Sequence, residues 1–159
     1  MRWLVWFVLA PQAFLLAGLA ASFGVPLLDC GALVCMFCAL FADVRLLPGL
    51  LLGAAVGRAM VDEASIPVQI LVIGVPIALL LPMRPLFDRH HWWWQAMAAA
   101  MCSIAVPKLA GLGGLWFDQP SASAQLDFAN VLFTAIAGPV LLWPLRRLPP
   151  LRALTEKLP

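Results

Sequence analysis

Apolar stretches long enough to cross a lipid bilayer follow one another along this chain and leave little sequence between them. The 159 residues are 64% hydrophobic and 11% charged, whereas soluble domains are about 45–50% apolar and about 25% charged. A membrane-spanning helix needs about 20 apolar residues. We therefore predict an all-α integral membrane protein, one transmembrane domain over residues 1–159, with six spans at about 3–22, 26–42, 46–61, 66–83, 92–112 and 126–145.

The basic residues gather beside one set of span ends. Loops on the cytoplasmic side of a membrane carry an excess of Lys and Arg, so both termini and the hairpin at 84–91 are predicted to be cytoplasmic. A bacterial cytoplasmic membrane is the natural location for such a chain. The basic side holds eight of the ten Lys and Arg residues: Arg2, Arg45, Arg84, Arg89, Arg146, Arg147, Arg152 and Lys157. The other side holds acidic residues: Asp62, Glu63, Asp118 and Asp127.

Three glycines recur at every fourth residue in the third apolar stretch. Gly49, Gly53 and Gly57 follow Pro48, which suits the first turn of a helix, where a backbone N–H has no helical partner. Residues four apart share a helix face, and a glycine face lets a second helix approach closely in lipid. That helix could belong to the same chain or to a partner, and a bulky side chain at the central Gly53 is expected to be tolerated least. Arg58 beside this face is a functional candidate because it is ionisable at membrane depth, unless it only extends its charge to the interface.

The first span carries a second smooth face. Ala13, Ala17 and Ala21 are also four residues apart, so small side chains line one side of that helix. We expect this face, like the glycine face, to be a candidate surface for binding a partner helix.

Few residues are suited to catalysis or metal binding. Asp29 and Asp127 are predicted near the outer ends of their spans, where they could form a pair or could simply begin helices, as the helix dipole favours. Cys35 and Cys38 form a C-x-x-C without a second pair, whereas structural zinc sites have four ligands. The chain has no phosphate-binding loop of the type G-x-x-x-x-G-K-S/T. We predict no enzymatic activity, no metal, no cofactor and no nucleic-acid partner.

Another group of glycines lies at the end of the fifth stretch, at Gly111, Gly113 and Gly114. Glycine is common just past the end of a helix, where the backbone turns left-handed. These glycines predict that the fifth helix ends near residue 112.

The last span and the tail carry a resemblance to a known family. They read L-F-T-A-I-A-G-P-V-L-L-W-P-L-R-R-L from Leu132 to Leu148, which resembles the ending of MreD, the rod-shape-determining membrane proteins. A small apolar helix reaching Asp43, followed by a leucine- and glycine-rich helix, resembles the middle of that family, and the length fits as well. The chain departs from the family in lacking tyrosine and in its tryptophan cluster at Trp92–Trp94.

The resemblance implies a non-catalytic scaffold of the bacterial cell-elongation machinery, which builds peptidoglycan in rod-shaped cells. It implies binding to a bitopic protein of the MreC type and, through it, to MreB, RodA and a class B penicillin-binding protein. The partner's span would lie in the glycine or alanine groove. Cytoplasmic loops with Arg45, Arg84 and Arg89 would contact acidic filament surfaces or the anionic headgroups of membrane lipid.

A second function follows from a likeness in fold. MreD proteins are similar to the substrate-binding S components of energy-coupling-factor vitamin transporters, which have six spans and dock through an Ala-x-x-x-Ala face on the first helix. Ala13, Ala17 and Ala21 match that spacing. A vitamin pocket needs polar and aromatic lining on the outer side, and the chain offers few such residues there: Asp62, Glu63, Trp116, Asp118 and Gln125. We therefore expect a scaffold in an S-component-like bundle, with the transporter subunit as the alternative.

Overall fold

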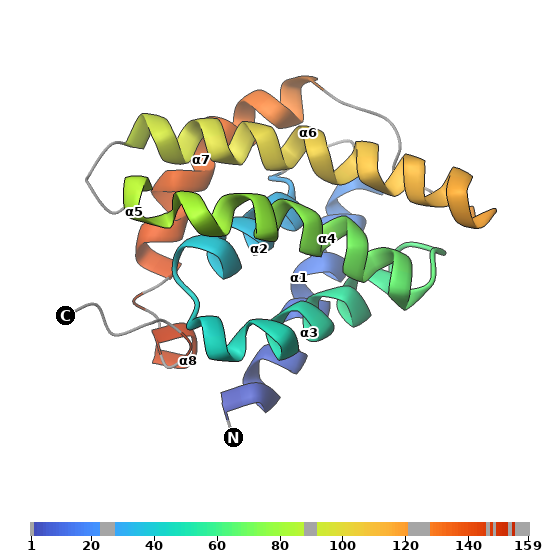
Figure 1. Ribbon diagram of the computed structural model, residues 1–159, viewed down its shortest axis with the longest axis horizontal. Helices are drawn as coiled ribbons and strands as arrows, with labels where there is room; N and C mark the ends of the chain where they lie inside the picture. The colour runs from blue at the N-terminus through green and yellow to red at the C-terminus, as the bar shows by residue number, and fades with distance from the viewer. Residues whose placement is uncertain are drawn as a thin grey trace.

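The described residues form a bundle of helices (Figure 1). The computed structural model describes residues 2–22, 28–87, 92–120, 128–145, 147, 149–152 and 154, and these contain helices and no strand. In chain order, the helices are α1 (Arg2–Ser22), α2 (Cys30–Leu40), α3 (Leu47–Ala59), α4 (Ile66–Leu80), α5 (Arg84–Phe87), α6 (Trp92–Phe117), α7 (Phe128–Leu145) and α8 (Pro149–Arg152). Two short 3-10 turns, η1 (Val44–Leu46) and η2 (Leu81–Met83), precede α3 and follow α4. The all-α prediction is confirmed for these residues.

Three helical stretches are long and apolar enough to cross a membrane: Ile66–Met83, Trp92–Phe117 and Phe128–Leu145. Two further apolar helices are shorter, Val5–Leu19 and Cys30–Leu40. The long stretches agree with the predicted spans that begin at residues 66, 92 and 126, and they indicate a membrane protein.

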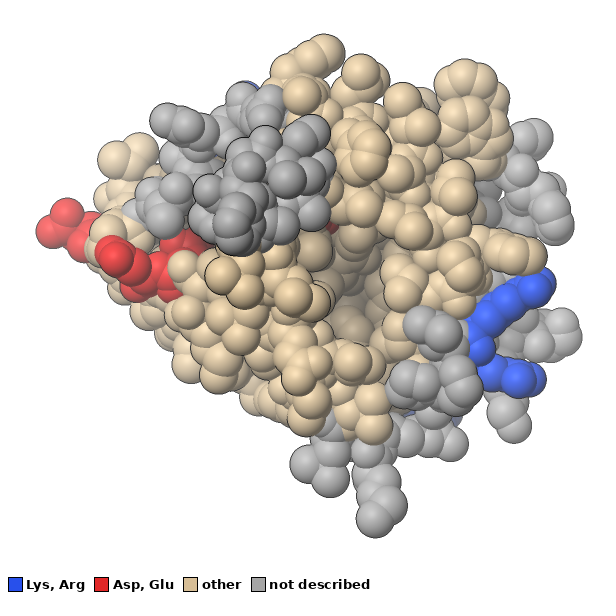
Figure 2. Space-filling view, turned by 180° about the vertical axis from the view of Figure 1, so that it is seen from behind, with Lys and Arg blue, Asp and Glu red and all other residues tan. Residues whose placement is uncertain are grey.

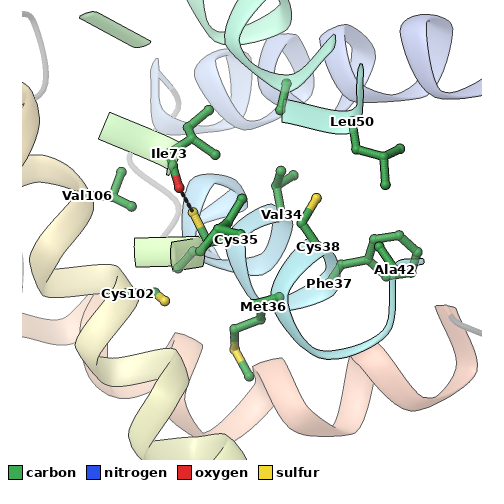
Figure 3. Close-up of a cluster of buried hydrophobic side chains, with 14 of the residues drawn as sticks. Val34, Cys35, Met36, Phe37, Cys38, Ala42, Leu50, Ile73, Cys102 and Val106 are labelled. Carbon is green, nitrogen blue, oxygen red and sulfur yellow. Dashed lines mark hydrogen bonds between the residues drawn. The ribbon is translucent and has the colours of Figure 1, made fainter. Parts of the chain in front are cut away.

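Helix α2 lies at the centre of the bundle and packs against α1, α3, α4, α6 and α7. Nearly all of its side chains are buried, as expected of a helix that is apolar all round; the buried residues are Gly31, Ala32, Val34, Cys35, Met36, Phe37, Cys38, Ala39 and Leu40. Figure 3 shows side chains of α2 directed towards Leu50, Ile73 and Val106 on surrounding helices. The short α2 is therefore the core around which the longer helices are arranged.

Polar side chains satisfy the backbone at both ends of α2. A helix leaves N–H groups at its start and carbonyls at its end without helical partners. Asp29 is the N-cap, and its Oδ1 accepts a hydrogen bond from the N–H of Ala32 at 3.1 Å. At the other end, the guanidinium of Arg84 donates to the carbonyls of Leu40 and Ala42. The expectation that Asp29 begins a helix is thus confirmed.

The expected end of the fifth helix near residue 112 is wrong, because α6 continues to Phe117. Gly113 is buried within α6, and a Cβ built on it would lie 2.8 Å from Cγ1 of Val68 on α4. Helix α6 therefore uses this glycine for close packing against α4 instead of for termination.

The end of α6 is formed by a left-handed residue a few positions later. Asp118 has φ 51°, and the N–H of Gln119 donates to the carbonyl of Gly114 at 2.9 Å. This is the pattern that commonly closes an α-helix, with Asp in the place of the usual glycine. The Oε1 of Gln119 then accepts from the N–H of Ser65 at 2.8 Å, which joins the end of α6 to the start of α4.

Charge is separated between the two ends of the bundle. Figure 2 shows acidic side chains at one end of the molecule and basic side chains at the opposite end. The acidic end lies where α3 and α6 finish, and its residues are Asp62, Glu63 and Asp118. The start of α3, the end of α4 and α8 come together at the other end, where Arg84 binds the carbonyl of Ala42 and the N–H of Asp43 donates to Leu154.

Candidate functional site

The glycine face of α3 is filled by α1 of the same chain. A Cβ on Gly53 would lie 2.8 Å from Cδ1 of Trp6, and a Cβ on Gly57 would lie 2.8 Å from the backbone nitrogen of Pro11. The indole of Trp6 is held there because its Nε1 donates to the carbonyl of Leu50 at 2.8 Å. At Gly53 and Gly57 the structure therefore has the internal packing that was one of the two alternatives.

The other predicted partner-binding residues are not buried against α1 as Gly53 and Gly57 are. Gly49 at the start of α3 is half-buried, and so are Ala13 and Ala17 on α1, whereas the side chain of Ala21 lies outside the described residues. The inward face of α1 is formed instead by residues four apart: Trp6, Ala10 and Phe14. Binding of a partner by the glycine or alanine residues stays a prediction.

The predicted loop contacts fall into three environments. Arg45 is exposed in η1, as a headgroup-binding residue must be. Arg84 is half-buried because its guanidinium binds the carbonyls at the end of α2. Arg89 lies outside the described residues. Arg84 therefore stabilises the bundle, which its position in a basic hairpin did not reveal.

Polar side chains from five helices meet inside the bundle near the acidic end, and we call them the interior polar cluster: Asp29, Arg58, Asp62, Gln69, Ser103 and Thr134. Asp29 joins three helices. Its Oδ2 accepts from the hydroxyl of Ser103 on α6 at 3.2 Å, and its N–H donates to Oγ1 of Thr134 on α7 at 3.0 Å. Ser103 and Thr134 are both buried, and their partly buried hydrogen bonds to Asp29 fix the start of α2 to α6 and α7.

Arg58 connects the two halves of the interior polar cluster. It is 7% exposed, and its Nε lies 3.8 Å from Oδ2 of Asp62, which is 6% exposed. A Cβ on Gly31 would lie 3.1 Å from Oδ1 of Asp29 and 3.3 Å from Nη1 of Arg58. The absence of a side chain at Gly31 therefore allows the guanidinium to approach the Asp29 carboxylate. Arg58 is an internal charge, so the alternative in which it extends to the interface is wrong.

Gln69 on α4 completes the interior polar cluster. It is fully buried, and its Nε2 donates to Oδ2 of Asp62 at 3.0 Å. Its Oε1 is buried and accepts no hydrogen bond from the described part of the chain, and the same holds for Oδ1 of Asn130 on α7. Buried polar atoms in proteins nearly always have a partner, so these two amide oxygens mark places where a donor is missing.

Asp29 meets Ser103 and Thr134, and its possible partner Asp127 lies outside the described residues. The Asp29 carboxylate accepts from the hydroxyl of Ser103 and from the N–H of Ala32, and the backbone N–H of Asp29 donates to Thr134, so the residue is well placed for packing helices together. The absence of enzymatic activity stays a prediction.

The cysteines are part of the apolar core. Cys35, Cys38 and Cys102 are buried and free, and the thiol of Cys35 donates to the carbonyl of Ile73 at 3.6 Å (Figure 3). Within the residues that the structure describes, no three His, Cys, Asp or Glu side chains are grouped to hold a metal ion. These thiols behave as small apolar side chains, as free cysteines commonly do in protein interiors.

Gln69, Ser103 and Thr134 were not singled out from the sequence. Each lies in an otherwise apolar helix, and a polar residue in such a helix commonly faces the interior of a membrane bundle. That signal could have identified all three, but it could not have shown that they converge on Asp29 and Asp62.

Comparison of the chain with protein-family models, with curated proteins and with solved structures gives no match.

Proposed function

We propose that this chain is a non-catalytic membrane scaffold of the bacterial cell-elongation machinery, of the MreD kind, that binds a bitopic MreC-type protein by contact between helices in the bilayer. The support is the resemblance of residues 132–148 together with the position of this segment. Most of it forms α7, which lies on the outside of the bundle and can be reached by another helix within the membrane.

The outer side of α7 has a regular apolar ridge. Leu132, Ile136 and Val140 are four residues apart and are 54%, 55% and 68% exposed. The opposite side of α7 is buried through Thr134, Gly138 and Leu142. In lipid, helices associate mainly through close van der Waals packing, and rows of side chains four residues apart are the ridges that pack into a neighbour's grooves. We therefore place the partner's span on this ridge, since α1 already fills the glycine face at Gly53 and Gly57.

The proposal includes six spans in an S-component-like bundle, in a bacterial cytoplasmic membrane with both termini cytoplasmic. The separation of acidic and basic ends supports this orientation, because positively charged residues favour the cytoplasmic side. Reporter fusions at His91 and Pro159 should read cytoplasmic, and fusions at Asp62 and Ser121 should read external. An external C-terminus would contradict this topology.

Co-purification from native membranes tests the function. Replacing Leu132, Ile136 and Val140 by Ala should lower recovery of the MreC-type protein at least tenfold, which corresponds to about 1.4 kcal/mol of binding free energy. Abundance of the scaffold should not change, because these side chains are exposed. A matched control replaces an equally spaced, exposed row on α4, namely Leu71, Val75 and Leu79.

Two results would overturn the proposal. Equal loss in the α7 and α4 variants would mean that the ridge is not specific. Recovery of ATP-binding and coupling subunits of a transporter, without an MreC-type protein, would support the S-component alternative instead.

A further inference from the structure

One side of the central helix α2 is open to the outside of the bundle. Leu33, Phe37 and the C-cap Phe41 are four residues apart and form one row, and Leu33 and Phe41 are only partly buried. Helices α1 and α7 both pack against α2, but their described residues do not pack extensively on each other. Both pass behind other helices in Figure 1, and the view from behind in Figure 2 shows a hollow in the middle of that face, which we call the rear hollow.

The row on α2 is the apolar floor of the rear hollow, because α1 and α7 border it on either side. The ring of Phe37 stacks on Trp6 of α1 with 5.7 Å between centroids. On the other side, Cδ2 of Leu33 would lie 3.4 Å from a Cβ built on Gly138 of α7. The row rises about 12 Å along α2 from Phe41 to Leu33, which is close to the roughly 15 Å of hydrocarbon in one leaflet of a bilayer.

The rear hollow meets the basic end of the bundle. Phe41 leads into Asp43, whose N–H donates to the carbonyl of Leu154 just after α8, and α8 packs against α1. Figure 2 shows the basic side chains to the right of the hollow. The apolar floor therefore runs from the interior of the bundle to a positively charged rim.

Arg147 on this rim is held so that it can bind an anion. It follows the end of α7, is exposed, and its guanidinium lies 3.8 Å from the centre of the Trp143 ring. Stacking on a ring uses none of the N–H donors of arginine, and these donors match the oxygens of a phosphate. Within the described part of the chain, no carboxylate forms an ion pair with Arg147. Arg152 on α8 is exposed as well, which adds positive charge to the rim.

A lipid with a negatively charged headgroup complements both the apolar floor and the basic rim. We propose that the rear hollow binds one anionic phospholipid, with an acyl chain along Leu33 and Phe37 and its phosphate on Arg147. Helix α7 is long and apolar enough to cross a membrane, so the hollow beside it opens to lipid. Basic residues at a membrane surface attract anionic lipids. The site does not use the α7 ridge, so it goes beyond the scaffold function and does not depend on it.

The test is native mass spectrometry of the purified full chain, released from detergent micelles after titration with one lipid at a time. Phosphatidylglycerol is compared with phosphatidylcholine that has the same acyl chains. One phosphatidylglycerol per chain should bind at least fivefold more tightly than phosphatidylcholine. Equal binding of the two lipids would show ordinary contact with the bilayer and overturn the proposal. A dimer without lipid would assign the hollow to a second copy of the chain and overturn it as well.

Variants at the rim locate the headgroup. Arg147→Gln should weaken the binding of phosphatidylglycerol about fivefold, as expected for one basic residue near an anionic surface, and should leave phosphatidylcholine unchanged. Lys108→Gln removes the same charge from an exposed position in the half of α6 that leads to the acidic end, so it should have no effect. Unchanged binding in Arg147→Gln, or an equal loss in Lys108→Gln, would overturn the assignment.

Variants on the floor locate the acyl chain. Leu33→Phe fills part of the rear hollow and should weaken the binding of both lipids, whereas Leu16→Phe makes the same change at a side chain of α1 that is 65% exposed and should not. Unchanged lipid binding in Leu33→Phe would contradict the position of the acyl chain. Because Arg147 is exposed, its variant decides the question even if Leu33→Phe does not fold.

Discussion

Gly57 is the position at which the smallest added side chain should do the most damage. A Cβ there would lie 2.8 Å from the backbone nitrogen and 2.9 Å from Cα of Pro11, and 3.1 Å from the carbonyl carbon of Ala10. Carbon atoms in favourable contact are about 3.5–4.0 Å apart, so α1 and α3 must separate. Overpacking costs about 1–3 kcal/mol, and the backbone obstacle places Gly57→Ala at the upper end. The better helix propensity of Ala returns about 1 kcal/mol, which leaves a net loss of about 2 kcal/mol.

The assay is thermal unfolding of the purified chain in detergent, with Gly49→Ala as the matched control on the same helix. Gly49 is half-buried in the first turn of α3, so Ala should be neutral or slightly stabilising there. A loss of about 2 kcal/mol corresponds to a Tm lower by roughly 4–8 °C for a chain of this size. If Gly57→Ala is as stable as Gly49→Ala, α1 does not pack on α3 as described, and the reasoning is wrong.

Three further substitutions test other contacts of the bundle by the same unfolding assay. Gly113→Ala should lower the free energy of unfolding by about 1–2 kcal/mol, because the added methyl overlaps the side chain of Val68. When Val68→Ala is made in the same chain, most of the loss caused by Gly113→Ala should disappear, so the effects of the two substitutions are not additive. Additive losses in the double variant would contradict this contact. Thr134→Val should cost about 1–3 kcal/mol because it leaves the partly buried N–H of Asp29 without its acceptor. Thr134→Ser should cost less, and equal losses in the two variants would argue against this hydrogen bond. Trp6→Phe removes the indole donor to the buried carbonyl of Leu50 on α3 and should cost about 1–2 kcal/mol; an unchanged stability would argue against this hydrogen bond.

Much of the helical framework was predictable because it depends on local patterns. Apolar stretches predicted where α4, α6 and α7 begin, and Pro48 predicted the first turn of α3. Asp29 was a candidate helix start, and it is the N-cap of α2. These features are encoded within a few neighbouring residues, so a sequence is enough to recognise them.

Close approaches between helices could not be predicted, because they depend on residues distant in the chain. A glycine that ends a helix and one that admits a neighbouring side chain look the same in sequence, and Gly113 proved to be the second kind. Gly53 was expected to tolerate an added side chain least, because it is the central glycine of its face. The structure makes Gly57 more sensitive, because its obstacle is the backbone of α1 whereas that of Gly53 is a side chain. Arg58 could likewise have reached the interface, and only the fold shows it between Asp29 and Asp62.

Site-specific photo-crosslinking at Ile136 tests the central claim most directly, since it asks in native membranes which protein lies against α7. A photoreactive residue at Ile136 should form an adduct with a single-span protein of the MreC type, and the same residue at Leu79 on α4 should not. Both positions are exposed, at 55% and 66%, so access to the reagent is matched. An adduct with that protein at Leu79 and not at Ile136, or with transporter subunits at Ile136, would contradict the proposed scaffold and its docking ridge.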